Sequence, residues 1–313
     1  MALTGATGFL GRHVVVALAA SGLRLRILAR RDPAHPLWRN LIPEVVPGGI
    51  DDAAALARLV HGADVVVHLA GLVRARSRRE FLRVNRDGAA RLAETLRRVA
   101  PAAHLIGISS LAAREPLLSP YAESKQAGER AMAEAFADGR LTVLRPPVVY
   151  GPWDRATLGI FRAAARRIVP VPGAPEARIA IIHVADAAAA IAALAAWAEA
   201  PGGARYALAD PNPAGYSPRD IMGMAAAALG NTPRFVGLPS VALRVAGQVA
   251  SLASWLGSRP GFFSAGKARE MLHPAWSIAP QELLPAKIAH SCIELRQGFA
   301  ATAAWYREAG WLA

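Results

Sequence analysis

Cysteine, lysine and long uncharged hydrophobic runs are all scarce in this sequence of 313 residues. Cys292 is the only cysteine, which excludes an intramolecular disulfide and a cysteine-rich metal site. No run reaches the roughly 18 uncharged apolar residues of a membrane span, and Val184–Trp197, one of the closest, contains Asp186. We therefore expect no integral membrane span and no metal site. The chain enters a strand and a glycine loop at once, without a signal peptide, so we expect it in the cytoplasm.

Charge of one sign dominates, with a formal net charge of +13. Such a balance is compatible with nucleic-acid or anionic-membrane binding. However, lysine occurs only at positions 125, 267 and 287, and the arginines are spread along the whole chain. They form no nucleic-acid-binding motif, and a coding bias that replaces lysine by arginine accounts for them. We predict no nucleic-acid partner.

A glycine-rich turn follows the first residues of the chain. Met1–Thr4 is expected to be a strand, Gly5, Gly8 and Gly11 follow it, and a helix is expected from Arg12 to about Ser21. Glycine lets the backbone turn sharply and approach a pyrophosphate, while the helix N-terminus offers free N–H groups to the anion. A glycine triplet that leaves a strand and opens a helix predicts dinucleotide binding.

The end of the second expected strand, Leu23–Ala29, bears on the choice of cofactor. Arg30 and Arg31 stand where an acidic residue would bind the ribose hydroxyls of NAD. Arginine suits the 2′-phosphate of NADP instead, and Arg12 could lend a further charge. We therefore expect NADP in preference to NAD, with two solvated arginines as the alternative interpretation.

Strands and helices alternate over about the first 145 residues. Ala63–Gly71 is typical of a buried parallel strand with a small-residue exit, and His104–Ser110 ends in two hydroxyls. Leu141–Arg145 is expected to be the sixth strand. The pattern predicts an α/β Rossmann fold with a doubly wound parallel sheet. We expect a dinucleotide-binding domain over residues 1–150 and a substrate-binding region over 151–313, partly interleaved with the main sheet.

Tyr121 and Lys125 lie four residues apart at the head of an expected helix, so both fall on one face of it. Ser119 and Pro120 are typical of an N-cap and a first helical residue. A phenol titrates near 10, and a nearby ammonium favours its phenolate form. The pair is therefore suited to acid–base chemistry, although a bare Tyr-x-x-x-Lys is more often an ordinary surface feature.

Several motifs together resemble an extended short-chain dehydrogenase/reductase of the NAD(P)-dependent epimerase/dehydratase type. They occur in that family's order over roughly the first 190 residues. The matching stretches are Thr4–Gly11, His68–Gly71, Val84-Asn85, Ser109-Ser110, Tyr121–Lys125, Arg145–Gly151 and Ile182–Asp186.

The resemblance implies a role for individual residues. Tyr121 would be the acid/base, Lys125 would bind the nicotinamide ribose and lower the tyrosine pKa, and Ser110 would hydrogen-bond the reacting oxygen. Ser109 is the alternative for that last role, and Asn85 matches a structural or relay position. The expected cofactor-binding residues are Gly5, Thr7, Gly8, Phe9, Leu10, Gly11, Arg30, Arg31, Ile50, Leu69, Ala70, Gly71, Asn85, Ser109, Tyr121, Lys125, Pro146 and Val148.

The sequence also departs from the family pattern. Gly49-Ile50 replaces the usual acidic–aliphatic pair that contacts adenine, and Asp51 or Asp52 could compensate. Leu111 and Ala112 follow Ser110 where sugar-nucleotide dehydratases carry Asp-Glu, which disfavours dehydration. The short link from Ser110 to Tyr121 leaves little room for the substrate-covering loop of many sugar epimerases.

The second half is expected to be a smaller, mostly helical substrate region. Helices are expected near Pro218–Leu229, Ser240–Leu256, Ser264–Leu272 and Ser291–Glu308. Strands at Ile179–Ile182 and Arg205–Ala209 should rejoin the main sheet or a small one beside it. Tyr150, Trp153 and Arg178 are the substrate-contacting candidates in this half.

The motifs favour an oxidoreductase that moves hydride between NADP(H) and a secondary alcohol or ketone of a small molecule. One alternative is a nucleotide-sugar epimerase that retains its NAD(P). A second is a non-catalytic nucleotide-holding protein similar to the short-chain-dehydrogenase-like accessory subunit of complex I. A homodimer that packs through the Tyr121–Lys125 helix is a further expectation.

Overall fold

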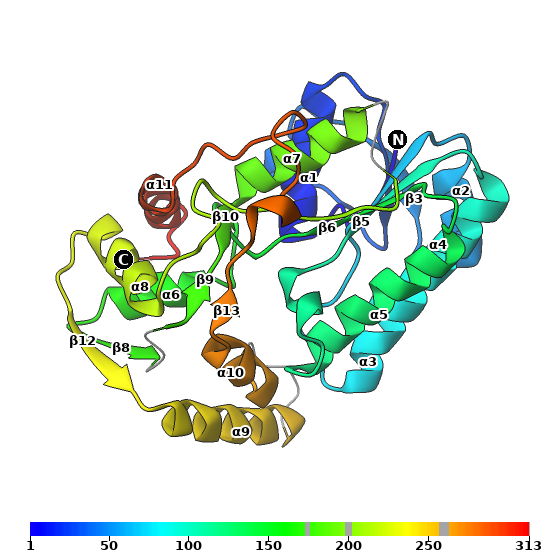
Figure 1. Cartoon of the computed structure of the whole chain (residues 1–313). Helices are drawn as coiled ribbons and strands as arrows, with labels where there is room; N and C mark the ends of the chain where they lie inside the picture. The colour runs from blue at the N-terminus through cyan, green and yellow to red at the C-terminus, as the bar shows by residue number, and fades with distance from the viewer. Residues whose placement is uncertain (173–175, 198–201, 257–262, 313) are drawn as a thin grey trace. The chain divides into compact units, whose positions relative to one another are not determined.

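The computed structural model describes residues 1–172, 176–197, 202–256 and 263–312. Seven of the described strands form one parallel sheet in the order β11-β6-β5-β4-β1-β2-β3 (Figure 1). The predicted Rossmann sheet is thereby confirmed. Chain order reverses between β1 and β4, so the carboxyl ends of these two strands flank the crevice where such sheets bind ligands. The strands are β1 (Ala2–Thr4), β2 (Arg26–Ala29), β3 (Glu44–Pro47), β4 (Val65–His68), β5 (His104–Ile108), β6 (Leu141–Arg145) and β11 (Arg205–Ala207).

Helices cover both faces of this sheet (Figure 1). On one face lie α2 (Ala53–Val60), α4 (Gly88–Val99) and α5 (Pro120–Ala135), and on the other α1 (Phe9–Ala20) and α7 (Val184–Ala196). Shorter turns join them: η1 (Pro36–Trp38), α3 (Arg78–Leu82), the π-helical turn η2 (Arg83–Asp87) and the 3₁₀ turn η3 (Leu111–Arg114).

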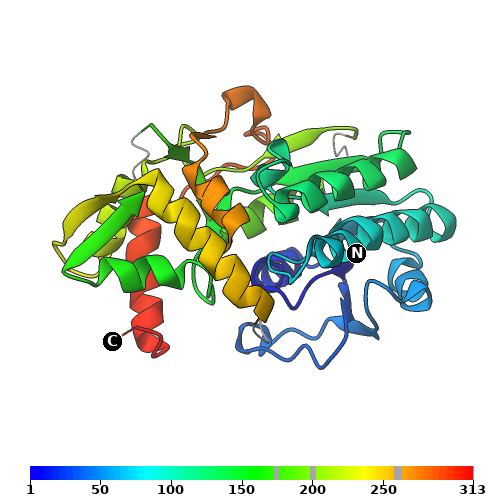
Figure 2. The same ribbon diagram turned by 90° about the horizontal axis from the view of Figure 1, so that it is seen from below.

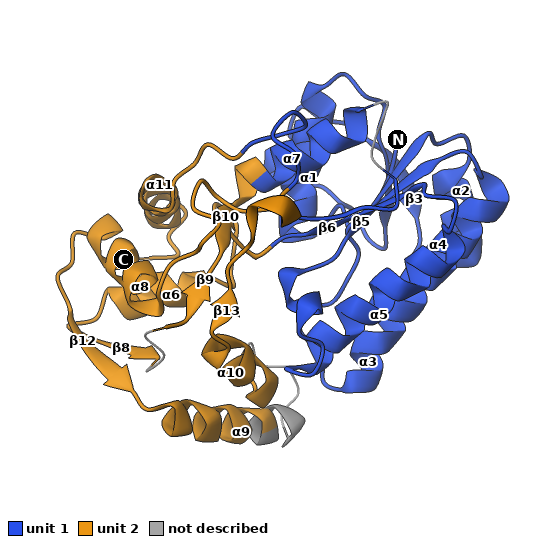
Figure 3. Ribbon diagram, in the orientation of Figure 1, with its two compact units in different colours: residues 1–146, 187–207, 284–290 blue, residues 147–186, 208–283, 291–313 orange. Residues whose placement is uncertain are grey.

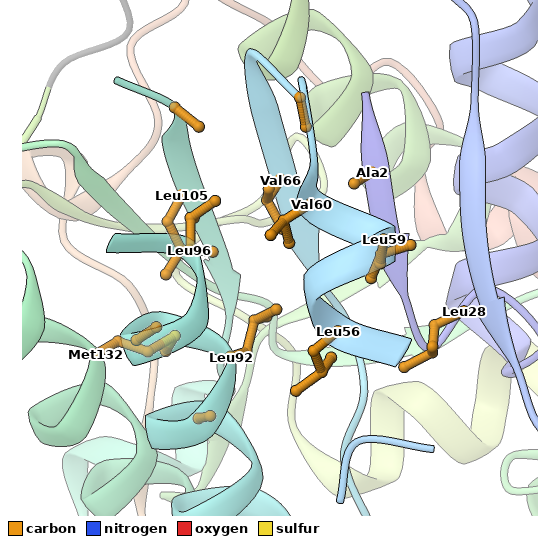
Figure 4. Packing of buried hydrophobic residues seen from close by; sticks show 14 of the residues in the cluster. Ala2, Leu28, Leu56, Leu59, Val60, Val66, Leu92, Leu96, Leu105 and Met132 are labelled. Carbon is orange, nitrogen blue, oxygen red and sulfur yellow. The ribbon is translucent and has the colours of Figure 1, made fainter. Parts of the chain in front are cut away.

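Leucines at helical spacing build the core under one face of the sheet. Figure 4 shows Leu56 and Leu59 of α2 beside Leu92 and Leu96 of α4, all fully buried against the strands. Each fully buried leucine contributes about 1.5–3 kcal/mol to folding, so this layer holds the sheet to its helices. The expected N-cap of the Tyr121–Lys125 helix is confirmed, because the Ser119 hydroxyl accepts a hydrogen bond from Ala122 N.

A buried ion pair fixes α5 to the sheet. Glu129 is 2% exposed and accepts two hydrogen bonds from the Arg145 guanidinium of β6, at 2.9 and 2.6 Å. Arg205 of β11 adds a longer contact of 3.7 Å to the same carboxylate. This bidentate geometry locks the register of α5 over β6 and therefore the height of Tyr121 and Lys125 above the sheet.

The chain divides into two compact units that do not follow a single cut (Figure 3). Unit 1 comprises residues 1–146, 187–207 and 284–290, and unit 2 comprises 147–186, 208–283 and 291–313. Most of α7, together with β11, returns to unit 1 after the chain has entered unit 2. β11 joins the main sheet beside β6, whereas β9 (Arg178–Ile179) and β10 (Ile181–His183) remain outside it.

Unit 2 contains more strand than its sequence indicates. Its described strands form three parallel pairs, β7–β10, β8–β12 and β9–β13, completed by β7 (Val148–Tyr150), β8 (Ile168–Pro172), β12 (Arg234–Leu238) and β13 (Ala275–Trp276). The helices are α6 (Leu158–Ala164), α8 (Pro218–Ala228), α9 (Ser240–Leu256), α10 (Ala265–Leu272) and α11 (Leu295–Glu308), with the 3₁₀ turn η4 at Pro280–Glu282. An aromatic core of Tyr150, Phe161, Phe299 and Tyr306 binds α6 and α11 to β7.

Arg145→Met should lower the free energy of unfolding by about 3 kcal/mol, because it leaves the Glu129 carboxylate buried without its main partner. Denaturant unfolding followed by circular dichroism measures this loss. Glu129→Met added to Arg145→Met should recover part of it. As a control, Arg86→Met breaks an exposed pair with Asp87 and should change stability far less. Equal losses for the two single variants would contradict the structural role of the buried pair.

Candidate active site

The turn from Gly5 to Gly11 is packed too tightly for side chains. Gly5 has a φ of +73°, and a Cβ added there would lie 2.5 Å from Ala70 N. A Cβ on Gly11 would lie 2.1 Å from Gly5 O. Helix α1 then begins after Gly8 with no side-chain cap, so the N–H groups of its first turn are open to an anion. This cradle fits the pyrophosphate of a dinucleotide.

The exit of β4 lies beside this turn and is fixed by a buried polar pair. Thr4 Oγ1 and His68 Nδ1 are hydrogen-bonded at 2.7 Å, and Ala70 N donates to Thr4 Oγ1 at 3.3 Å. Burial lowers the pKa of His68 to about 3, with a smaller contribution from the Lys125 charge. His68 is therefore neutral at physiological pH and holds β1 and β4 together as a hydrogen-bonding group.

Asn85 joins three segments of unit 1. Its Oδ1 accepts from Leu72 N at 2.7 Å, and its Nδ2 donates to Leu72 O at 3.0 Å and to Ser124 Oγ at 2.9 Å. Ser124 Oγ in turn donates to Tyr121 O at 2.7 Å. Asn85 lies in the π-helical turn η2, and a Cβ on Gly128 of α5 would be 2.3 Å from Asn85 O. Isolated π turns are frequent at functional sites.

Lys125 lies in α5 one turn after Tyr121, and its Nζ donates to Ile108 O at the end of β5, at 2.8 Å. Burial lowers the pKa of its ammonium to about 8, opposed by the negative charge of Glu129. A Cβ on Gly71 would lie 3.1 Å from Asn85 Oδ1 and 3.7 Å from Lys125 Nζ. The structure thus gathers Gly71, Asn85 and Lys125 around one position at the exit of β4.

Tyr121 and the serine pair lie on the elements that flank this position. The Tyr121 ring is partly buried, with its centroid 6.0 Å from that of Phe81. Ser110 caps η3, where its Oγ accepts from Ala112 N at 3.2 Å and keeps its own O–H available to donate. Ser109 is buried, and its Oγ finds no hydrogen-bond partner among the described residues. Leu111 N donates to Pro146 O at 2.9 Å, which places Pro146 beside the serine pair.

Positive side chains surround the end of β2. Arg30 and Arg31 are exposed there, whereas the Arg12 Nε is buried and has no hydrogen-bond partner within the described chain. Burial lowers the pKa of Arg12, and burial together with the Arg12 charge lowers the pKa of His35. Trp38 Nε1 donates to Arg12 O at 3.1 Å, so η1 lies against the start of α1.

At Gly49, the position expected to contact adenine, the backbone lies against the carboxylate of Asp51. A Cβ on Gly49 would lie only 2.5 Å from Asp51 Oδ1 and 3.5 Å from the Arg30 Cδ. Asp52 caps α2 by accepting from Ala55 N, so its carboxylate already has a structural role. Asp51 and Asp52 were the two candidates to replace the missing acidic side chain at position 49. Of these, Asp51 places its carboxylate where a side chain of residue 49 would begin.

The remaining candidates fall into two groups. In unit 1, Ile50 packs against Gly88, and Leu69 N donates to Thr4 O at 3.1 Å. Val148, Tyr150, Trp153 and Arg178 all belong to unit 2.

Tyr150 does not present its hydroxyl to a substrate surface. It is 0% exposed and packs edge-on against Phe299, with ring centroids 4.9 Å apart, so the expectation of a direct substrate contact needs correction. Its position just after the sixth strand suggested that it lies near the substrate, but its ring packs inside the aromatic core of unit 2. Trp153 packs against Trp305 at 4.8 Å, and Arg178 is exposed on β9.

Three residues that support the site were not predicted from the sequence. Thr4, His68 and Ser124 lie inside the recognised motifs, yet their hydrogen bonds join residues 64 and 39 positions apart. The signal in the sequence for the Asn85 contact was Ser124, a small hydroxyl residue between Tyr121 and Lys125.

The lowered pKa of Lys125 predicts a pH-dependent stability. Between about pH 8 and pH 10.5 the folded chain releases this proton while the unfolded chain keeps it, so stability should rise with pH across that window. The free energy of unfolding of the wild type, minus that of Lys125→Met, should therefore increase by roughly 3 kcal/mol from pH 7.5 to 10.5. Urea titrations at several pH values test this, and a pH-independent difference would refute the lowered pKa.

Comparison with known proteins agrees with this geometry. Residues 1–209 match the NAD dependent epimerase/dehydratase family. The chain is 47% identical over 315 residues to the ceramide reductase of Caulobacter vibrioides, covering 100% of this chain and 96% of that protein. It is 30% identical over 173 residues to a 4-hydroxy-2-methyl-3-oxo-4-farnesyl-3,4-dihydroquinoline-1-oxide ketoreductase of Stigmatella aurantiaca, covering 50% of this chain and 52% of that one.

A solved structure shows the same fold. The UDP-glucose 4-epimerase of Thermus thermophilus, in complex with NAD, superposes with a TM-score of 0.70 at 20% identity and covers 98% of each chain. Together with the glycine cradle and the Tyr121–Lys125 helix, these matches place the chain in a family. It belongs to the NAD dependent epimerase/dehydratase family, and it is an NAD(P)-dependent oxidoreductase of the extended short-chain dehydrogenase/reductase type.

Proposed function

We propose that this enzyme uses NADPH to reduce the ketone of an oxidised ceramide-type lipid to a secondary alcohol. The observation that carries this proposal is the 47% identity to a ceramide reductase along the entire chain. The partial match to a ketoreductase favours the same reaction on a ketone. The absence of an acidic pair after Ser110, where Leu111 and Ala112 stand, argues against dehydration.

Four residues of unit 1 have separate roles in the proposed reduction. The bound cofactor supplies hydride from its nicotinamide ring. Tyr121 donates its phenolic proton to the carbonyl oxygen, and Ser110 donates a second hydrogen bond to the same atom. With a pKa of about 8, Lys125 is mostly protonated at pH 7 and stabilises the phenolate that Tyr121 leaves behind. Asn85 holds the Leu72 loop and the head of α5 in register through its three hydrogen bonds.

The preference for NADPH rests on the positive charge near the end of β2. Arg30 and Arg31 are exposed at the position where family members read the ribose, and no acidic residue replaces them there. Arg12 carries a buried Nε without a partner in the described chain, which a phosphate could satisfy. We also propose that the enzyme acts in the cytoplasm and that it dimerises through α5.

Turnover assays with a panel of substrates test the proposal. The panel contains an N-acylated 2-amino-3-oxo long-chain lipid, the same lipid with shortened acyl chains, simple ketones and UDP-sugars. Loss of NADPH absorbance together with the expected alcohol by mass spectrometry should appear with the lipid ketone. Epimerisation of a UDP-sugar by cofactor retained in the purified enzyme would favour the epimerase alternative. Failure with every substrate would favour a nucleotide-holding role.

Replacing Arg30 and Arg31 by alanine should weaken NADPH binding at least about tenfold and leave NADH binding nearly unchanged, because one charge-assisted phosphate contact is worth about 1.5–3 kcal/mol. Fluorescence titration of each nucleotide gives the two dissociation constants. Arg97→Ala with Arg98→Ala removes the same charge from α4 and should leave both constants unchanged. Equal affinities of the unmodified enzyme for NADPH and NADH would end the proposed preference.

Tyr121→Phe should reduce turnover at least about 100-fold, because it removes only the proton donor. Nucleotide affinity and stability should stay close to the wild type, since the ring remains beside Phe81. Tyr206→Phe removes a hydroxyl from β11 and serves as the matched control, with activity retained. Single-turnover measurements of hydride transfer separate the chemical step from substrate binding. A Tyr121→Phe enzyme with full activity would show that the proton comes from elsewhere.

A further inference from the structure

Helix α9 of unit 2 exposes apolar side chains along one line of its surface. Val241, Val245 and Val249 are 64%, 57% and 63% exposed. They are spaced four residues apart, so they form one continuous stripe on the helix surface. We call Val241, Val245 and Val249 the α9 stripe. Scattered exposed valines are ordinary, but three aligned on one helix are not scattered.

The opposite side of α9 is already packed, so the stripe cannot be the inner face of the helix. Leu243 is 9% exposed, and a Cβ on Gly247 would lie 2.8 Å from Ala268 Cβ of α10. At about 100° per residue, Val245 points about 180° away from the midpoint between Leu243 and Gly247. Ala265 N also donates to Ser251 Oγ at 2.8 Å, which fixes the two helices side by side (Figure 2).

Such a stripe reverses the usual pattern of a surface helix. The outward line of a helix in a globular protein normally carries polar or charged residues. Valine is also only a moderate helix former, since its branched side chain loses rotamer freedom. Neither local propensity nor the packing of α9 against α10 explains why three valines occupy these positions. A surface that covers the stripe from outside explains them.

Charge around the stripe identifies what kind of surface fits. Residues 221–269 contain no Asp or Glu. The basic residues of this segment are Arg234, Arg244, Arg259, Lys267 and Arg269. Arg244 is exposed on α9 beside the stripe, and Arg234 is exposed on β12, the strand that leads into α9. Lys267 is paired with Glu270 at 3.1 Å, so Arg234 and Arg244 are the basic residues that carry the argument. An apolar stripe with exposed arginines beside it complements an anionic surface with an apolar layer beneath it.

Two further apolar side chains are exposed on β12, the strand before α9, and on β8, the strand paired with it. Val236 on β12 is 41% exposed, and Ile168 on β8 is 57% exposed. The two strands are paired, with Ile168 opposite Arg234 and Val236 opposite Pro170. Arg234 and Val236 lie two positions apart on β12, so a basic and an apolar exposed side chain share one face of that strand.

We propose that unit 2 binds the surface of an anionic phospholipid bilayer through α9. The α9 stripe enters the boundary between headgroups and acyl chains, while Arg234 and Arg244 contact lipid phosphates. No helix in the described ranges is long and apolar enough to cross a membrane, so the contact is interfacial. A second copy of the chain fits less well, because a self-complementary contact would bring Arg244 onto its own copy with no carboxylate from residues 221–269 to pair with it. The inference stands on this surface alone and would hold whatever the substrate.

Vesicle flotation of the full chain tests the apolar part. The wild type should float with vesicles of phosphatidylcholine and phosphatidylglycerol, and Val241→Gln/Val245→Gln/Val249→Gln should lose at least tenfold in partitioning. Glutamine is a good helix former, and circular dichroism checks that the helix content is kept. Ile42→Gln/Val73→Gln/Leu117→Gln removes three exposed apolar side chains from unit 1 and should float like the wild type.

A second pair of variants tests the charge. Arg234→Gln/Arg244→Gln should lose roughly 30-fold in partitioning on the anionic vesicles, since each basic residue near such a surface contributes about fivefold, the equivalent of about 1 kcal/mol. On pure phosphatidylcholine the same variant should bind like the wild type. Arg97→Gln/Arg98→Gln removes equal charge from α4 and should retain binding to the anionic vesicles.

Three results would overturn the proposal. The wild type could fail to float with anionic vesicles at low salt. The unit 1 control could lose as much binding as the α9 stripe variant. Light scattering could show that the stripe variant turns a dimer into a monomer while flotation is unchanged, which would assign the stripe to a second copy instead.

Discussion

The hydrogen bonds of the Asn85 amide are the constraint on which the candidate site depends. They connect the loop after β4, through both backbone groups of Leu72, with the head of α5, through Ser124. Asn85 is 4% exposed, and a buried amide with this many partners is costly to disrupt because each orphaned polar group loses its solvation without compensation. The π-helical turn turns this side chain toward both segments at once, and Gly128 allows α5 to approach its backbone. Tyr121 and Lys125 are therefore carried on a helix whose position is set by a residue in another element.

Electrostatics within the same region separate the roles of the titratable groups. Burial lowers the imidazole pKa of His68, and the nearby Lys125 ammonium lowers it further. Since the two cannot both be charged at low cost, His68 remains neutral and serves as a hydrogen-bonding partner for Thr4. Lys125 keeps the positive charge at pH 7, although burial brings its pKa to about 8. The buried Glu129 opposes that shift, so the ion pair that anchors α5 also helps to keep Lys125 protonated.

Local signals in the sequence were sufficient for most of unit 1. The glycine spacing predicted the turn before α1, and the buried runs predicted β4, β5 and β6, because these features depend on residues adjacent in the chain. The parallel pairs of unit 2 could not be predicted in the same way. β9 and β13 contain two residues each, and β8 pairs with β12 more than 60 positions later, so their partners are set by tertiary packing. The hydrogen bonds of Asn85 have the same origin, whereas the burial of Tyr150 reflects an aromatic core assembled from β7, α6 and α11.

The net charge of +13 combines two effects that composition alone does not separate. A coding bias toward arginine explains why lysine is rare, since it exchanges one cation for another. It does not explain why residues 221–269 contain no acidic side chain although the whole chain has 23. In unit 1, arginines have carboxylate partners such as Glu44, Glu123 and Glu129. Near α9, Lys267 pairs with Glu270, whereas Arg234 and Arg244 are exposed in a stretch that contains no carboxylate of its own. The same stretch carries the outward valines of α9, on the side opposite Leu243 and Gly247. Exposed arginines and an exposed apolar stripe thus occur together on α9 and on the strand that precedes it, and this combination reflects a property of the surface rather than a coding bias.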